Sequence, residues 1–159
     1  MVKVGDKIPD VPVKVARESG NEEATTGELF SSKLVVLVAV PGAFTPTCSA
    51  KHLPGFVERA SELKEKGVDL IACISVNDVH VMNAWGKAQS AMGKVLMIAD
   101  GNGDFARAMG LVFDGRNFGM GERSRRYATV IDRGVVKHLA IEEPGKLEAS
   151  TAEAILRAL

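Results

Sequence analysis

This 159-residue sequence contains few cysteines, no surplus of charge of either sign and no long hydrophobic run. Two cysteines are too few for the disulfide framework of a small secreted domain. Twenty basic residues balance twenty acidic ones, so the chain lacks the positive field that non-specific nucleic-acid binding or a polybasic membrane contact requires. The longest apolar run, Leu34–Val40, is far too short to cross a bilayer. We therefore expect neither nucleic-acid nor membrane partners, and a small-molecule ligand is favoured.

The N-terminal stretch MVKVGDKIPDVPVKV contains no apolar core as long as that of a signal peptide. We expect a cytoplasmic protein, or an organellar one if a transit peptide was removed. Hydrophobic residues make up 46% and charged residues 25% of the chain, which is the composition of an ordinary globular protein. A chain of this length can bury one core without help from metals or disulfides. Residues 1–159 are therefore expected to form a single domain.

Buried strands and amphipathic helices alternate along the first two thirds of the chain. The β-branched run LVVLVAV predicts a strand buried on both faces, and a weaker strand is expected near residues 11–15. Apolar residues at helical spacing over 53–63 predict a helix that Gly67 closes. The pattern then predicts a strand from Val68, a helix capped by Asp78 and running towards Met92, a strand in KVLMIAD and a short helix over 104–109.

The last third of the sequence does not continue the alternation of strands and helices. Residues 110–121 are rich in glycine and carry no clear periodicity. RYATVID and VVKHLAIEE predict two strands joined by a tight turn, and STAEAILRAL predicts a final helix with Ser150 or Thr151 as its cap. Parallel crossovers followed by a hairpin predict an α/β protein with a mixed central sheet and helices on both faces. Among common folds of this size, that order is typical of thioredoxin-like domains.

Cys48 lies in a polar loop that proline interrupts, just before a predicted helix. Thr45 as N-cap and Pro46 as first helical residue would place Cys48 in the first turn, where unpaired N–H groups favour a thiolate. A free thiol is only about 3% ionised at neutral pH, and holding it mostly ionised takes about 3 kcal/mol. A helix end contributes about 1 kcal/mol. A cationic partner is therefore expected.

Three arginines are candidates for that partner. They crowd the start of a predicted strand in GERSRRY, at positions 123, 125 and 126. If the strand starts at Arg126, alternation places Arg126, Ala128 and Val130 on one face and the residues between them on the other. Strand periodicity alone does not choose among the three arginines.

An inert, buried cysteine is the alternative interpretation of each thiol, because free cysteine is among the most buried residue types. The polar surroundings of Cys48 favour a reactive residue. Cys73 lies inside the apolar run LIACISV, which favours a packing role.

The stretch PGAFTPTCS places Pro41, Thr45 and Cys48 in the P-x-x-x-T-x-x-C arrangement of peroxiredoxins. The longer stretch VPGAFTPTCSAKHLPGFVE resembles the type II (peroxiredoxin 5) subfamily. The stretches ACISVNDV and GKVLMIADGNGDFARAMG and the Trp85-Gly86 pair resemble it too, so the similarity covers essentially the whole chain.

This resemblance implies a thiol-dependent peroxidase that reduces hydrogen peroxide and alkyl hydroperoxides, without a metal or other cofactor. It implies that Cys48 is the peroxidatic cysteine, that the Thr45 hydroxyl positions it, that Pro41 shields the thiolate and that Arg126 is the catalytic arginine. Five residues are expected to bind or surround the substrate: Gly42, Phe44, Thr47, Leu53 and Phe118.

The resemblance also implies a second thiol that reduces the sulfenic acid formed on Cys48. Animal members carry a resolving cysteine near the C-terminus, and the stretch KLEASTAEAIL has none. Plant and many bacterial relatives have two cysteines at the separation of Cys48 and Cys73, and are reduced by glutathione with glutaredoxin or by thioredoxin. We expect such an external thiol, because Cys73 could resolve only if the structure opened locally. Type II relatives also imply a homodimer.

Three other functions compete with this one. Cys48 and His52, four residues apart, could hold a metal, but two ligands are too few for zinc and His52 is expected to be solvated or at the edge of the core. A cysteine hydrolase would use His52, His80 or His138 as its base, yet none has a recognisable partner in the sequence. The third is a non-enzymatic thioredoxin-like binding or redox-sensing module.

Overall fold

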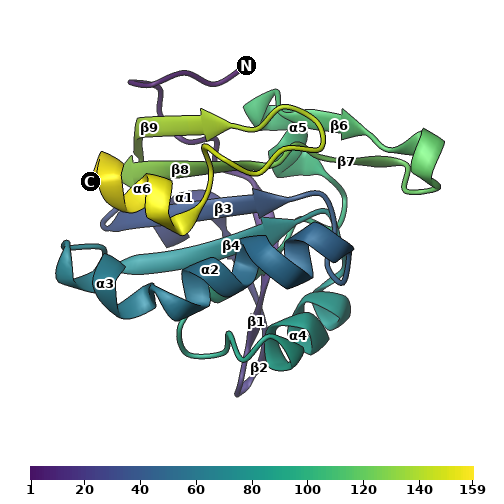
Figure 1. The fold of residues 1–159 in the computed structure, drawn as a ribbon, viewed down its shortest axis with the longest axis horizontal. Helices are drawn as coiled ribbons and strands as arrows, with labels where there is room; N and C mark the ends of the chain where they lie inside the picture. The colour runs from purple at the N-terminus through teal and green to yellow at the C-terminus, as the bar shows by residue number, and fades with distance from the viewer.

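The computed structural model describes residues 1–159 and contains a seven-stranded mixed sheet with helices on both faces (Figure 1). The strands of this sheet are β1 (Pro12–Arg17), β2 (Gly20–Thr25), β3 (Leu34–Val40), β4 (Leu70–Ser75), β5 (Leu96–Ala99), β8 (Tyr127–Asp132) and β9 (Val135–Ile141). Their order across the sheet is β2-β1-β5-β4-β3-β8-β9. The three central strands β5, β4 and β3 are parallel, and the outer pairings are antiparallel. The predicted thioredoxin-like, mixed-sheet α/β class is confirmed.

The helices divide between two hydrophobic clusters, one on each face of the sheet. They are α1 (Thr26–Phe30), α2 (Leu53–Glu58), α3 (Ala60–Glu65), α4 (Val79–Ala88), α5 (Asp104–Met109) and α6 (Ala152–Ala158). Residues of α2, α3, α4 and α6 belong to the cluster that contains Cys48, and residues of α1 and α5 belong to the other. Strand β3 serves both clusters: Val36, Val38 and Val40 face one, and the residues between them face the other. The sheet is therefore buried on both sides, as LVVLVAV predicts.

Most predicted elements are present, with changes at their ends. The helix predicted over 53–63 divides at Arg59, whose backbone leaves the helical region, and Gly67 adopts the left-handed conformation that ends the second part. Asp78 caps α4 as predicted by accepting a hydrogen bond from the Val81 amide at 2.9 Å. That helix ends at Ala88 rather than near Met92.

The glycine-rich segment, for which the sequence shows no periodicity, contains a small hairpin. Strands β6 (Val112–Asp114) and β7 (Glu122–Ser124) flank the short 3-10 helix η2 (Arg116–Phe118). Figure 1 shows this hairpin projecting beyond the end of the main sheet. Strands of three residues are too short for alternation to reveal.

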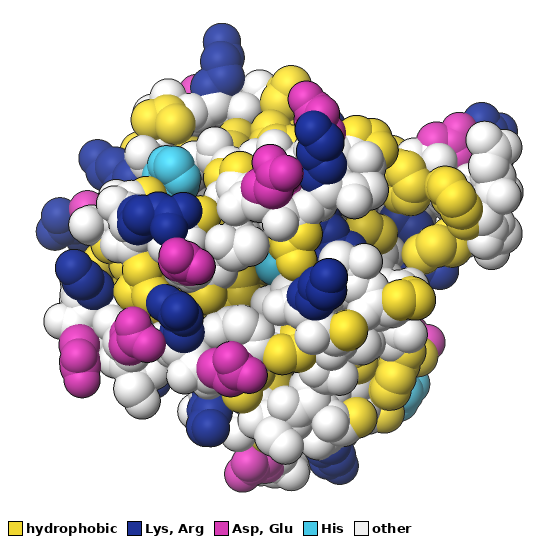
Figure 2. All heavy atoms as spheres, viewed as in Figure 1, with side chains coloured by type: hydrophobic (Ala, Val, Ile, Leu, Met, Phe, Trp, Pro, Cys, Tyr) yellow, Lys and Arg dark blue, Asp and Glu magenta, His cyan; other side chains and the backbone are white.

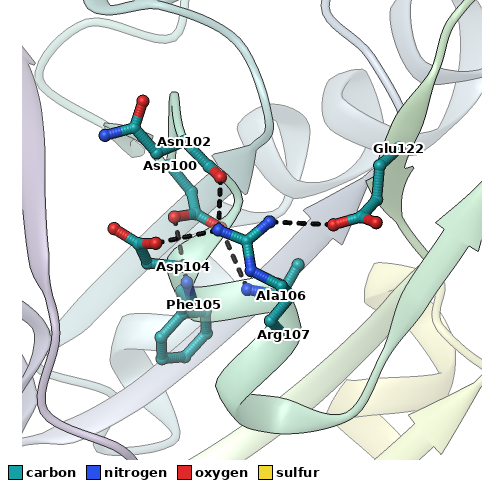
Figure 3. Close-up of polar contacts among 7 residues, drawn as sticks. All are labelled: Asp100, Asn102, Asp104, Phe105, Ala106, Arg107 and Glu122. Carbon is teal, nitrogen blue, oxygen red and sulfur yellow. Dashed lines mark hydrogen bonds and ion pairs between the residues drawn. The ribbon is translucent and has the colours of Figure 1, made fainter.

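Arg107 ties helix α5 to the hairpin. Its guanidinium donates to the Glu122 carboxylate of β7 at 2.8 Å and to Asp104 at 2.9 Å (Figure 3). Asp100 accepts hydrogen bonds from the Phe105 and Ala106 amides, both at 3.0 Å, and so caps the start of α5. These contacts fix the base of the hairpin relative to the sheet.

Candidate active site

Cys48 and Arg126 meet because β3 and β8 are antiparallel neighbours. Ala39 near the end of β3 pairs with Tyr127 at the start of β8. The segment after β3 and the residue before β8 therefore lie at the same edge of the sheet. Across this edge, Nη2 of Arg126 donates a hydrogen bond to Sγ of Cys48 at 3.1 Å.

The strand alternation of β8 determines which arginine faces the thiol. Ala128 and Val130 belong to the hydrophobic cluster that contains Cys48, and Tyr127 and Ile131 belong to the cluster on the other face. The alternation predicted from a strand beginning at Arg126 is thus observed. It directs Arg126 towards Cys48.

The other two candidate arginines make different contacts. Arg123 donates to the backbone carbonyls of Met120 at 2.8 Å and Val76 at 2.9 Å. Arg125 makes one long contact of 3.4 Å with the Glu142 carbonyl. Arg126 is the arginine that reaches the sulfur, which answers the question that the sequence leaves open.

The two thiols are both free and fully buried, but their electrostatic surroundings differ. Cys48 has the Arg126 guanidinium against its sulfur, with Nη2 at 3.1 Å. Cys73 lies in the central strand β4, and burial, followed by the nearby Cys48, raises the pKa of its thiol. Cys73 therefore remains a protonated thiol at neutral pH, which agrees with the packing role predicted for it.

Thr45 does not cap the helix through its side chain, in contrast to the sequence-based prediction. Its hydroxyl donates to the Gly42 carbonyl at 2.6 Å, within the loop that follows β3. Helical backbone does begin at Pro46, and Cys48–His52 form one turn of π-helix that leads into α2. Because the Thr45 proton is committed to Gly42, the hydroxyl oxygen is left as an acceptor.

The loop that carries Thr45 is held from the neighbouring strand. The Ala43 amide donates to Oδ1 of Asn77 at 2.9 Å, and the Ser75 hydroxyl donates to the same oxygen at 2.6 Å. Phe44 then adopts a positive φ of 62°, a conformation uncommon outside glycine. The hydrogen bonds of Ala43 to Asn77 and of Thr45 to Gly42 hold the chain on either side of this residue.

His52 is buried and bonded to Arg126, so the prediction of a solvated or core-edge residue is wrong. Nη1 of Arg126 lies 2.8 Å from Nδ1 of His52, and Nε2 of His52 lies 2.9 Å from the Ser150 carbonyl. Arginine can only donate, so Nδ1 is the acceptor and Nε2 carries the proton. Burial lowers the pKa of His52 from 6.5 to about 4, which keeps this neutral tautomer at physiological pH.

Ser150 and Glu142 extend this arrangement away from the sulfur. The Glu142 carboxylate accepts from the Ser150 hydroxyl at 2.7 Å, the Ser150 amide at 2.9 Å and the Glu148 amide at 2.7 Å. The Glu142 amide also donates to the Arg126 carbonyl at 2.9 Å. Cys48, Arg126, His52, Ser150 and Glu142 thus form one continuous hydrogen-bonded chain. Ser150 therefore bonds to His52 and Glu142, and Thr151 is the residue that caps α6.

Two of the five residues expected around the substrate, Thr47 and Phe118, line a cavity of about 170 Å³. Pro41, expected to shield the thiolate, and Arg126 also line this space. Gly42 lies under the hairpin, where an added Cβ would be 3.1 Å from Met120. Leu53 is fully buried in the core, and the side chain of Phe44 is exposed to solvent. The structure therefore places these last three residues outside the wall of this cavity.

Little in the sequence indicates that Asn77, His52, Ser150 and Glu142 belong to this site. Each is a polar residue in a segment without a motif known to be catalytic, and the contacts of His52 and Ser150 join residues 98 positions apart. The HLPGF sequence after Cys48 was a weak signal for His52 alone, because a histidine one helical turn after a nucleophile can face the same partner.

Replacing Thr45 by valine is expected to slow the reaction of Cys48 with peroxide by about two orders of magnitude. Valine keeps the shape of threonine but removes the acceptor oxygen and the bond to Gly42. Single-turnover mixing of reduced protein with hydrogen peroxide measures the effect. Thr45→Ser keeps the hydroxyl and should recover most of the rate; a valine variant as fast as the serine variant would rule out a role for this hydroxyl.

Acid is expected to destabilise the fold through His52. Its pKa is about 4 in the folded protein and 6.5 when unfolded, so between these values the unfolded chain binds the extra proton. Stability is therefore fully present above about pH 6.5 and falls as the pH drops, by up to about 1.4 kcal/mol per pH unit. Urea unfolding at several pH values measures this slope. His52→Gln should flatten it, whereas substitution of the exposed His80 should leave it intact.

The fold places the chain among thioredoxin-like proteins, and the contact with Arg126 distinguishes Cys48 from the second thiol. No helix of the structure is long and apolar enough to span a membrane.

Comparison with known proteins defines the family. The Redoxin family model matches residues 3–156. Peroxiredoxin-2E, chloroplastic, from Arabidopsis thaliana is 49% identical over 99% of this chain and 69% of its own length, and Peroxiredoxin-2B from the same plant is 45% identical over 99% and 98%. The structure of reduced Prx3 in complex with H2O2 from Vibrio vulnificus has a TM-score of 0.93 and 51% identity, with 99% of this chain and 96% of that chain covered. The chain belongs to the Redoxin family and is a peroxiredoxin, a thiol-dependent peroxidase.

Proposed function

We propose that Cys48 is the peroxidatic cysteine and that it reduces hydrogen peroxide and alkyl hydroperoxides with the help of Arg126 and Thr45. The observation that carries this assignment is the 3.1 Å contact between the Arg126 guanidinium and the Cys48 sulfur. A cation held against a sulfur favours its thiolate, which is the nucleophilic form. Cys73 has no hydrogen-bonding cation, and burial raises its pKa.

In the reaction, the Cys48 thiolate attacks one oxygen of the hydroperoxide. A sulfur–oxygen bond forms while the oxygen–oxygen bond breaks, and the leaving oxygen takes up a proton to depart as water or an alcohol. Sulfur is oxidised by two electrons to a sulfenic acid, and the peroxide is reduced by the same two electrons. Negative charge moves from sulfur to the leaving oxygen during this step, so groups that stabilise that oxygen accelerate it.

Arg126 and Thr45 have complementary roles in this step. Arg126 is a hydrogen-bond donor, so it can stabilise negative charge first on the sulfur and then on the peroxide oxygens. The Thr45 oxygen is held as an acceptor by its bond to Gly42, so it can receive the O–H of the peroxide and orient it. Pro41 lines the cavity together with Arg126, and its proposed role is to exclude water from one side of the thiolate. The structure of the Vibrio vulnificus relative in complex with H2O2 supports this substrate.

We further propose that the sulfenic acid is reduced by an external thiol, supplied by glutathione with glutaredoxin or by thioredoxin. The first thiol forms a mixed disulfide with Cys48 and releases water; a second thiol then releases Cys48 and leaves as the disulfide. Cys73 is an unfavourable resolving residue because it is fully buried in a central strand, where it pairs with Val38. A disulfide to Cys48 from that position would require local opening.

Replacing Cys73 by serine is expected to leave most glutaredoxin-supported turnover in place. Because a buried hydroxyl without a partner costs stability, Cys73→Ala is the matched second variant. Steady-state turnover with glutathione and glutaredoxin, and separately with thioredoxin, measures the effect. Loss of most activity in both variants, with folding intact, would show that Cys73 resolves Cys48.

A homodimer is proposed as the working form. Phe44 and Phe118 are large hydrophobic side chains near the active site, and they are 55% and 72% exposed. Packing these side chains between two copies of the chain would remove apolar surface from water. Sedimentation of the protein at several concentrations tests this proposal. A cytoplasmic location is likewise proposed, or an organellar one if a transit peptide was removed, as the chloroplastic name of one relative suggests.

A further inference from the structure

The cavity lined by Thr47 and Arg126 is larger than hydrogen peroxide requires. Its volume of about 170 Å³ is several times the roughly 30 Å³ that a water molecule occupies in the liquid. It lies between the β6–β7 hairpin and the segment that follows β9. Figure 2 shows hydrophobic side chains and Lys or Arg side chains together in the hollow beside the projecting hairpin. The extra space can hold a substrate larger than the two reacting oxygens.

One wall of the cavity is aromatic. Phe113 and Phe118 stack with their ring centroids 6.2 Å apart, and both line the space. The Arg107–Glu122 ion pair at 2.8 Å holds the base of the hairpin that carries them. This wall suits the apolar part of an organic hydroperoxide.

The same cavity holds an arginine without a carboxylate partner. Six of the nine arginines form ion pairs, and Arg123, Arg125 and Arg126 do not. Arg126 is committed to Cys48 and His52, and Arg123 to two backbone carbonyls. Arg125 is half-buried, lines the cavity, and makes one long contact with a neutral carbonyl. Most of its donors are therefore free to bind an anion.

The two carboxylates that line the cavity do not compete for Arg125. Glu142 directs its carboxylate to Ser150 and Glu148, where it accepts several hydrogen bonds. Glu143 is paired with Lys146 at 3.3 Å. An incoming anion would thus meet the ion-paired Glu143 and a Glu142 carboxylate whose Oε2 already accepts three hydrogen bonds.

We propose that Arg125 is a specificity-determining residue that selects organic hydroperoxides carrying a carboxylate. The carboxylate pairs with the Arg125 guanidinium, the apolar part of the substrate packs against Phe113 and Phe118, and the hydroperoxide reaches Cys48. A planar guanidinium can bind a carboxylate through two parallel hydrogen bonds, which gives orientation as well as affinity. This inference rests on the proposed function of Cys48.

The test compares short straight-chain hydroperoxy carboxylic acids with their methyl esters. Reduced protein is mixed rapidly with each compound in the absence of any reductant, and oxidation of Cys48 is followed by tryptophan fluorescence. We expect the acid to react about tenfold faster than its ester, as one charge-assisted pair can provide. In Arg125→Gln this ratio should fall to about one, and in Arg125→Lys it should be intermediate because lysine keeps the charge without the paired donors.

Arg116→Gln is the matched control, because Arg116 lies on the β6–β7 hairpin but does not line the cavity, is largely exposed and is ion-paired with Asp114 at 2.7 Å. Its acid-to-ester ratio should equal that of the wild type. A wild-type ratio near one, or an unchanged ratio in Arg125→Gln, would overturn the proposal. An effect of Arg125→Gln confined to the later reaction with glutathione, whose carboxylates offer the same chemistry, would also overturn it.

Hydrogen peroxide separates this inference from the function on which it rests. If Cys48 reacts with hydrogen peroxide but the acid-to-ester ratio is near one, the selectivity proposal alone fails. If Cys48 does not react with hydrogen peroxide, the proposed function fails and the inference fails with it.

Discussion

Replacing Cys48 by serine is expected to abolish peroxide turnover, with a loss of at least about three orders of magnitude. Serine has nearly the same size, but its hydroxyl does not ionise at neutral pH and the oxygen cannot cycle through a sulfenic acid. The contact with Arg126 can persist, so the fold should be retained. Hydrogen peroxide consumption, measured with glutathione and glutaredoxin, checks the effect.

Cys73→Ser is the matched control for this experiment. It makes the same atomic change at the other thiol, also buried and on the same face of the sheet. The two variants should differ by several orders of magnitude in turnover. Equal activity would mean that the thiol beside Arg126 is not the nucleophile.

Replacing Arg126 by lysine or glutamine is expected to slow the reaction of Cys48 with peroxide by about 10²–10³-fold. The guanidinium contacts Cys48 through one nitrogen and His52 through the other, and a single ammonium cannot do both. Lysine is thus expected to restore only a small part of the rate. Single-turnover mixing with hydrogen peroxide separates this step from reduction by thiol.

A second measurement distinguishes a lost positive charge from a disturbed fold. Burial is the main reason for the low pKa of His52, and the charge of Arg126 lowers it further. Removing that charge should raise the His52 pKa above about 4, which can be followed by the imidazole resonances in NMR. Arg133→Gln, an exposed arginine in the β8–β9 turn, is the control and should change neither the rate nor the titration. An Arg126→Gln variant with the wild-type rate would remove Arg126 from the mechanism.

The sequence was informative wherever a local pattern determines the structure. The buried run of β3, the Asp78 cap and the alternation along β8 depend on residues next to one another, and all three are present as predicted. The alternation even assigned Arg126, Ala128 and Val130 to one face. It could not name the partner on that face, because Cys48 reaches it from 78 residues away.

Polar contacts between residues far apart in the chain could not be predicted from the sequence. The bond of the Thr45 hydroxyl to Gly42, in place of a helix cap, depends on the turn that Asn77 holds from β4. The burial of His52 depends on Ser150, which the sequence offers equally well as a helix cap. Such groups have several satisfactory partners in principle, and tertiary packing decides between them.

The hairpin β6–β7 shows a different limit. Its strands are three residues long and the segment between them is rich in glycine, so periodicity does not identify them. Its position depends on the Arg107–Glu122 ion pair and on the Arg125 amide, which donates to the Leu111 carbonyl at 2.8 Å. Phe118 was expected near the substrate, but the sequence did not predict that its ring stacks on Phe113.

The most direct test of the account is to locate the first oxygen transferred from peroxide to protein. Reduced protein is mixed with one equivalent of hydrogen peroxide and a sulfenic-acid trap, and both cysteine peptides are examined by mass spectrometry while Trp85 fluorescence is recorded. Trp85 donates to the Ser49 hydroxyl at 2.9 Å, so it lies beside the reacting segment. We expect a rapid fluorescence change, with the trap on Cys48 and none on Cys73. A trap found first on Cys73, or no modification of Cys48, would contradict it.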